Sequence, residues 1–272
     1  MSHLAETFAA ARADGRAALI AYLPAGFPTR VDCVPVIAAM VENGVDAVEI
    51  GLPYSDPLMD GPVIQAAVDS SLKAGTRIGD VMANVGGVVG TGAPTLVMSY
   101  WNPIERYGVD RFARELAEAG GCGVITPDLT PEEAGPWIEA TDEHGIDRVF
   151  LVAPSSSDER IETVVRACSG FVYAASTMGV TGARTAVSSS APELVSRVRQ
   201  HTTLPVCVGL VVSTRAQAAD VASYADGVIV GSAFVKALLD AESPGAGAAA
   251  AAALAAELAA GVRGASGVGV RA

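Results

Sequence analysis

Short apolar runs alternate with longer helical patterns along almost the whole chain. The apolar runs are rich in Val, Ile, Leu and Ala, which is typical of strands that are buried on both faces of a parallel sheet. Eight such runs can be counted from the N-terminus. They lie at 17–23, 47–50, 95–99, 123–126, 148–152, 170–174, 205–208 and 227–230.

The segments between the runs have the apolar spacing of helices, and most of them open with Pro, Asp, Ser or Thr, which favour a helix start. A short amphipathic helix is predicted at about 4–14, and Thr29 is predicted to cap a helix that extends to about Asn43. The alanine run at 246–258 predicts a last helix, because Ala has the highest helix propensity. The other helices are predicted near 62–74, 109–119, 131–144, 157–168, 190–201, 214–222 and 233–240.

Strands that alternate with helices predict βαβ units and a parallel sheet. Eight such units in about 250 residues is the number that forms a (β/α)8 barrel. A doubly wound open sheet is the alternative, but no Gly-x-Gly-x-x-Gly follows the first strand. We therefore predict an α/β fold: a single (β/α)8 TIM barrel with an extra N-terminal helix. It should form one domain over residues 1–272, with 264–272 as a frayed tail.

Composition narrows the class of protein. The net charge of −12 argues against a nucleic-acid partner, since phosphate contacts need clustered Lys and Arg. No signal peptide is visible in the first residues, and no apolar run is expected to reach the roughly 18–20 residues that span a membrane. The four cysteines have no paired spacing and are typical of core thiols in a reducing compartment. A cytoplasmic protein without a membrane partner is predicted.

The stretch 48–61 contains the most unusual residues. Glu49 interrupts the second apolar run, and a carboxyl group on a buried strand must be hydrogen-bonded, paired, or kept for a useful pKa shift. Gly51 is expected to let the chain turn out of the sheet. The following loop is stiffened by two prolines and carries two further acids, Asp56 and Asp60.

In a (β/α)8 barrel the functional groups gather at the carboxyl ends of the strands. Glu49 and Asp60 then belong to one face. Gly209 follows the seventh run, and Gly231 with Ser232 follows the eighth, where helix starts commonly hold a phosphate group. The three histidines lie in the N-terminal arm or at helix ends, without metal-ligand spacing. We therefore expect carboxyl groups to carry out general acid–base catalysis, and we expect no metal.

The motif Glu49-Ile-Gly-Leu-Pro-Tyr-Ser-Asp-Pro-Leu-Met-Asp-Gly61 closely resembles the signature of the tryptophan synthase α subunit family. The similarity extends along nearly the whole chain, through the segments 19–28, 100–103, 127–129, 171–173, 179–182 and 231–235. It implies a (β/α)8 barrel that cleaves indole-3-glycerol phosphate, a phosphate ester, into indole and glyceraldehyde 3-phosphate. This is a retro-aldol reaction.

The resemblance also implies roles for individual residues. Glu49 would be the proton shuttle, with a raised pKa, and Asp60 would stabilise the cationic indolenine, while Tyr173 would shape the site around Glu49. The implied substrate contacts are Tyr100, Leu129 and Thr181 around the indole, and Gly182, Gly209, Val211, Gly231 and Ser232 around the phosphate. Asp56, Pro57 and Asn102 would face a β subunit in an α2β2 complex. Pyridoxal phosphate is expected only on that β subunit, and this chain should need no cofactor.

Val211 departs from the family pattern, which commonly has a second glycine at this position. A β-branched side chain resists positive φ, so phosphate binding is either weakened or unaffected because the backbone is already extended. Met59 is a milder departure. Two alternatives to the subunit remain at this stage: a free-standing lyase that releases indole, and a weakly catalytic barrel that serves as a binding partner of a β-type protein.

Overall fold

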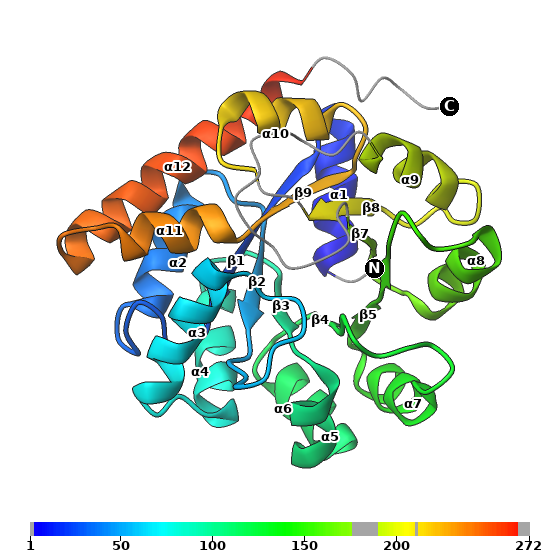
Figure 1. Cartoon of the computed structure of the whole chain (residues 1–272), viewed down its shortest axis with the longest axis horizontal. Coiled ribbons are helices and arrows are strands. Elements are labelled where there is room, and N and C mark those ends of the chain that lie inside the picture. Colours follow the sequence, from blue (N-terminus) through cyan, green and yellow to red (C-terminus); the bar gives the residue numbers. More distant parts are fainter. Residues whose placement is uncertain (1–2, 176–189, 210–211, 266–272) are drawn as a thin grey trace.

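The computed structural model describes residues 3–175, 190–209 and 212–265. Its strands form one parallel sheet that curls into a nearly closed barrel, with helices around the outside (Figure 1). The order of neighbours is β5-β4-β3-β2-β1-β9-β8-β7-β6. The predicted (β/α)8 barrel is thereby confirmed. The strands are β1 (Ala18–Pro24), β2 (Ala47–Gly51), β3 (Thr95–Met98), β4 (Gly123–Ile125), β5 (Asp147–Val149), β6 (Leu151–Val152), β7 (Val172–Ala175), β8 (Val206–Gly209) and β9 (Gly227–Val230).

The fifth predicted strand is divided in two. β5 pairs with β4 and β6 pairs with β7, so the strand changes partner at Phe150. The backbone N–H of Tyr173 donates a hydrogen bond of 3.2 Å to the Phe150 carbonyl, which continues the ladder across the break. Eight apolar runs therefore give nine strands without changing the topology.

Two helices were missed by the sequence prediction. α4 contains three glycines, which lower helix propensity, and α5 is short and has Pro103 at its third position. The predicted Thr29 cap is also wrong: Thr29 opens a turn, and α2 begins four residues later. The helices are α1 (His3–Ala13), α2 (Cys33–Glu42), α3 (Pro62–Lys73), α4 (Ile78–Val89), α5 (Trp101–Tyr107), α6 (Val109–Glu118), α7 (Gly135–His144), α8 (Asp158–Ala167), α9 (Ala191–Val198), α10 (Arg215–Ala222), α11 (Ser232–Leu239) and α12 (Pro244–Gly264).

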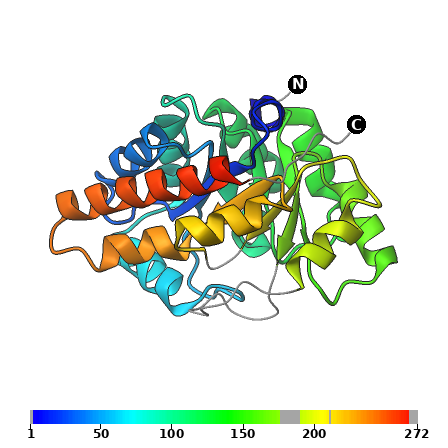
Figure 2. The same cartoon turned by 90° about the horizontal axis from the view of Figure 1, so that it is seen from above.

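The apolar core has two parts, one between strands and helices and one inside the barrel. The N-terminal helix α1 closes one end of the barrel interior with Leu4, Phe8 and Ala11. The Phe8 ring meets Phe171 edge-on, with 5.9 Å between the ring centroids. Figure 2 shows α1 at the end opposite to the loop between β2 and α3. The functional groups must therefore lie at the other end, where the strands terminate.

The last helix, α12, is long and apolar enough by length and composition to cross a membrane, which corrects the prediction that no apolar run reaches this length. It packs along α2, α10 and α11, and Ala251, Ala255 and Leu258 are fully buried there. Gly261 allows close approach to α10, since a Cβ at Gly261 would lie 2.4 Å from the Arg215 carbonyl oxygen. These contacts are those of a core helix. The tail residues 266–272 lie outside the described part of the chain.

Candidate active site

Glu49 lies in the middle of β2, two residues after Ala47, which faces the barrel interior. Side chains two residues apart on a strand share a face, so the Glu49 carboxyl group also points inward. It is 1% exposed, and its Oε1 has no hydrogen-bond partner among the described residues. Burial raises the pKa of Glu49 to about 8, which confirms the predicted rise.

Asp60 lies in the loop between β2 and α3, which we call loop 2 (residues 52–61). The Tyr100 hydroxyl donates a hydrogen bond of 3.0 Å to Asp60 Oδ1 and accepts one of 3.0 Å from the Met59 N–H. Burial raises the pKa of Asp60, and the Tyr100 hydrogen bond opposes that rise. Tyr100 is 5% exposed and stands at the end of β3, so one phenol fixes both the carboxylate and the loop.

Two tyrosines fill the mouth of the barrel between these acids. Tyr22 is paired in register with Glu49, and its pKa is raised first by burial and then by the charge of Asp60. Tyr173 is half-buried on β7, and its pKa is raised first by burial and then by the charge of Glu49. Tyr22 was not predicted as a site residue. The sequence did contain a pattern that could have identified Tyr22. Alternate residues of β1 face the barrel interior, and Ala18 and Ile20 precede Tyr22 on that face.

Glycines make room for these rings, which corrects the interpretation of Gly51. Gly51 has no positive φ, so the turn does not require glycine there. A Cβ at Gly51 would lie 2.3 Å from the Tyr22 hydroxyl, and one at Gly209 would lie 2.0 Å from the Tyr173 hydroxyl. Both strand-end glycines are therefore needed for the aromatic side chains opposite them.

Loop 2 is cross-linked to α5 at the barrel rim. The Asn102 side-chain amide donates a hydrogen bond of 3.0 Å to the Tyr54 hydroxyl, beside the Tyr100 bond to Asp60. Asp128 accepts the Trp101 N–H at 2.9 Å and so fixes the first residue of α5 from the end of β4. This role of Asp128 was not visible in the sequence, because it depends on two strand ends meeting in space.

The tip of loop 2 faces outward. Asp56 is exposed and Pro57 is partly exposed, and Leu58 beside them is 69% exposed. Leu129, an expected indole contact, is 6% exposed and follows β4 at the same rim. The described residues thus bring Glu49, Asp60, Tyr100 and Tyr173 to one end of the barrel.

The expected phosphate contacts are described only in part. β8 ends at Gly209, and Gly231 directly precedes Ser232, the first residue of α11. The first N–H groups of a helix have no partner within the helix, so this start presents donors and a positive dipole end to an anion. A Cβ at Gly231 would lie 3.0 Å from the Tyr22 ring, which places the helix start beside the site. Thr181, Gly182 and Val211 lie outside the described residues.

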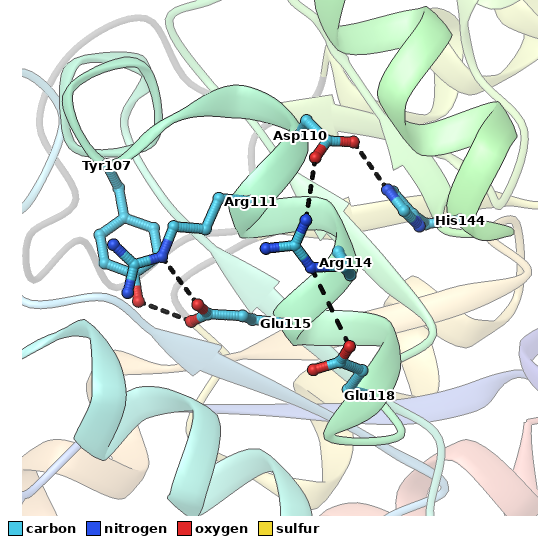
Figure 3. Close-up of polar contacts among 7 residues, drawn as sticks. All are labelled: Tyr107, Asp110, Arg111, Arg114, Glu115, Glu118 and His144. Atoms are coloured by element: carbon cyan, nitrogen blue, oxygen red, sulfur yellow. Dashed lines mark hydrogen bonds and ion pairs between the residues drawn. The ribbon is translucent and has the colours of Figure 1, made fainter.

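A cluster of charged side chains lies on α6 and α7, outside the barrel (Figure 3). The possible metal ligands of Asp110, Glu143 and His144 lie within 4.8 Å of one another. However, Asp110 Oδ1 contacts His144 Nε2 at 2.8 Å, and Asp110 Oδ2 accepts a hydrogen bond of 3.2 Å from Arg114. A guanidinium already neutralises the central carboxylate, so the arrangement is explained as an ion-pair network that ties α6 to α7.

Comparisons with known proteins agree with this geometry. The family model for the tryptophan synthase alpha chain matches residues 8–263. The chain is 59% identical to the tryptophan synthase alpha chain of Salinispora arenicola, over 97% of this chain and 98% of that protein. It is 60% identical to the corresponding chain of Streptomyces avermitilis, over 96% and 95%. A solved structure of Mycobacterium tuberculosis tryptophan synthase superposes with a TM-score of 0.90 at 55% identity, covering 96% of this chain and 98% of that chain.

Proposed function

This chain belongs to the tryptophan synthase alpha chain family, and from that premise we propose how its residues divide the cleavage of indole-3-glycerol phosphate into indole and glyceraldehyde 3-phosphate. The observation that carries the proposal is the Glu49 carboxyl group. It is enclosed in the barrel with one oxygen unpartnered among the described residues, and its pKa lies at about 8. A carboxyl group in that state is protonated at neutral pH and can donate its proton.

Glu49 is the proton shuttle of the retro-aldol reaction. It first gives its proton to C3 of the indole ring, which places positive charge on the ring nitrogen. The carboxylate that remains then takes the proton of the glycerol hydroxyl next to the ring. The carbon–carbon bond breaks, its electron pair returns to the indole ring, and the hydroxyl carbon becomes the aldehyde of glyceraldehyde 3-phosphate. Glu49 ends protonated, as it began.

Asp60 stabilises the cationic indolenine by accepting the indole N–H. This task needs an ionised carboxylate, although burial raises the pKa of Asp60. The Tyr100 hydroxyl opposes the rise and leaves Asp60 Oδ2 for the substrate, since the phenol donates to Oδ1. Tyr100 is therefore a positioning residue as well as part of the indole pocket. Tyr173 shapes the site around Glu49, and Leu129 and Thr181 complete the apolar pocket.

The substrate phosphate binds at the start of α11. Gly231 and Ser232 supply N–H groups and one hydroxyl, and Gly182, Gly209 and Val211 are the other phosphate contacts that we propose. The Tyr22 ring lies against Gly231 at one edge, and its hydroxyl lies against Gly51 at the other. Tyr22 thus spans the distance between the phosphate group and the catalytic acids, which suits a ligand with a phosphate at one end and a ring at the other.

The partner of this chain is a tryptophan synthase β subunit, in an expected α2β2 complex. Pyridoxal phosphate belongs to that β subunit, and the reaction described here uses side chains alone. Asp56, Pro57 and Asn102 form the docking surface at the rim. The exposed Leu58 supports this assignment, because it is one of only three large apolar side chains that are exposed in the described ranges. We propose that the complex is cytoplasmic.

Indole release from indole-3-glycerol phosphate by the purified chain, with and without the β subunit, tests the proposal. The wild-type chain should release indole without the β subunit, and it should do so faster when the β subunit is bound. Glu49→Gln should lose roughly 10²–10⁴ in rate, because an amide cannot transfer the proton. Its far-UV circular dichroism should match that of the wild type. Near-normal turnover by Glu49→Gln would refute the role of Glu49.

A further inference from the structure

A pocket lies between the connection from β1 to α2 and the first two turns of α4. Its volume is about 470 Å³, within the range of about 300–1,000 Å³ that small-molecule sites occupy. Its lining residues are Gly26, Arg30, Val31, Asp80, Ala83 and Asn84. None of them belongs to loop 2, to the expected substrate contacts or to the docking surface. The pocket is therefore separate from the active site and from the proposed partner contacts.

Asn84 supplies a buried hydrogen-bond donor to this pocket. The residue is 9% exposed, and its Oδ1 accepts a hydrogen bond of 3.1 Å from the Gly26 N–H. That bond fixes the orientation of the amide and leaves Nδ2 without a partner within the described ranges. Polar groups buried to this extent are normally hydrogen-bonded. A ligand that reaches Asn84 should therefore carry an acceptor for the two N–H groups of Nδ2.

Arg30 supplies a cation that is held in place across the pocket. Its Nη2 donates to Asp80 Oδ1, and Asp80 Oδ2 accepts a hydrogen bond of 2.8 Å from the Arg77 N–H. Asp80 lies in the first turn of α4, where these two donors and the positive end of the helix dipole offset its charge. Arg30 Nε and Nη1 form no hydrogen bond in the described part of the chain. This part of the guanidinium can therefore bind a second acid.

The chemistry of the lining selects one class of ligand. The unused polar groups of Asn84 and Arg30 are all donors, and a carboxylate offers acceptors to both and a charge to the guanidinium. The rest of the lining is apolar: Val31 is 81% exposed, and Ala83 lies on the first turns of α4. An inorganic anion would leave this apolar surface in water, whereas an apolar group attached to the carboxylate would cover it.

We infer that this pocket binds a small organic carboxylate, whose carboxylate group accepts hydrogen bonds from Asn84 and Arg30 and whose apolar part covers Val31. The binding does not depend on the proposed function, because the catalytic acids and the docking surface take no part in it. The pocket thus adds a ligand site to the cleavage reaction.

The test is titration calorimetry of the full chain with phenylacetate, which joins a carboxylate to an apolar ring. Phenylacetamide has the same shape without the charge and should bind about tenfold more weakly. Arg30→Gln should weaken phenylacetate binding by a similar factor, about tenfold. Asn84→Asp keeps an acceptor for the Gly26 N–H but replaces the donor with a negatively charged oxygen, so binding should be lost.

Arg114→Gln is the matched control. The Arg114 side chain is 47% exposed and that of Arg30 is 52% exposed, and both pair with an acid, but Arg114 lies on α6 and does not line the pocket. This variant should bind phenylacetate like the wild type. Asp60→Asn should also bind it unchanged, which distinguishes the pocket from the active site. Thermal unfolding checks the fold of each variant, and the exposed Arg30→Gln keeps the test valid if Asn84→Asp unfolds.

Three results would overturn the inference. The first is a wild type that does not bind phenylacetate, and the second is wild-type affinity in folded Arg30→Gln. The third is loss of binding in Asp60→Asn, because phenylacetate would then occupy the active site. Failure of the proposed cleavage would leave the phenylacetate titrations unchanged, so the two proposals are tested separately.

Discussion

Glu49 and Asp60 differ in their surroundings, and this difference supports the roles proposed for them. Burial raises the pKa of both acids. Only Asp60 receives a hydrogen bond that opposes the rise, from the Tyr100 hydroxyl at 3.0 Å. Glu49 has an unpartnered Oε1 among the residues described. Burial therefore keeps Glu49 protonated at neutral pH, whereas the hydrogen bond to Asp60 favours its ionised form. The proposed reaction needs both a proton donor and a fixed negative charge.

Removal of the Tyr100 hydroxyl should change the pH dependence of cleavage. In Tyr100→Phe the carboxylate of Asp60 loses its donor while it stays buried, so its pKa should rise. The proposed role requires ionised Asp60, so the acidic limb of kcat/KM should move to higher pH. The limb is measured from the rate of indole release between acidic and neutral pH.

Tyr224→Phe is the matched control for that change. Tyr224 precedes β9, at the end of the barrel remote from the acids, and its hydroxyl is buried without a hydrogen-bond partner in the described structure. The same chemical change there should leave the acidic limb in place. If the limb of Tyr100→Phe stayed with that of the wild type, Tyr100 would only line the indole pocket.

At the level of the strands, glycines and tyrosines form matched pairs. Gly51 ends β2 two residues beyond Glu49, the register partner of Tyr22, and Gly209 ends β8 two residues beyond Cys207, the register partner of Tyr173. The tyrosine rings occupy the space that the Cβ atoms of larger residues at positions 51 and 209 would need. The strand ends thus supply the space for the floor of the active site, and loop geometry does not explain these glycines.

Gly51→Ala should destabilise the fold because the new Cβ would lie 2.3 Å from the Tyr22 hydroxyl. Overpacking of this kind costs about 1–3 kcal/mol in the free energy of unfolding, measured by urea denaturation. The cost should be smaller in a Tyr22→Phe background, which lacks the closest atom. An equal cost in both backgrounds would mean that the hydroxyl does not determine the need for glycine.

Gly79→Ala is the corresponding control. A Cβ at Gly79 meets no atom within 4 Å, and the residue lies in the first turn of α4 without positive φ. Alanine there should stabilise the protein slightly, by about 0.5–1 kcal/mol, because glycine costs conformational entropy in a helix. A loss at Gly51 together with a gain at Gly79 would separate overpacking from a general effect of alanine.

The sequence prediction succeeded for the strands and failed for some of the helices. The eight apolar runs predicted all the strands of the barrel, because burial on both faces leaves a signal in the sequence itself. α4 was missed since its glycines hide the helical pattern, and the partner change at Phe150 leaves no local signal. Similarly, Asp128 could not be assigned to α5, because the contact joins the ends of different strands.

For the whole molecule, the sequence predicted the barrel and the face on which the chemistry lies. The position of Glu49 on an apolar strand was visible directly, and its raised pKa followed from that burial. The roles of Tyr22 and of the strand-end glycines depend on distances across the barrel mouth, which no spacing in the sequence reveals. Thr181, Gly182 and Val211 lie outside the described residues, so their phosphate and indole contacts stay predictions.

The central claim is that Glu49, protonated inside the barrel, delivers the proton that starts the cleavage. Its most direct test is the pH dependence of kcat/KM for indole release by the wild-type chain, since that profile reports the pKa values of the free enzyme. The folded pKa of Glu49 is raised to about 8, so the required proton is present below that pH and lost above it. We expect the rate to fall above about pH 8. A rate that stays constant well above this pH would contradict the account.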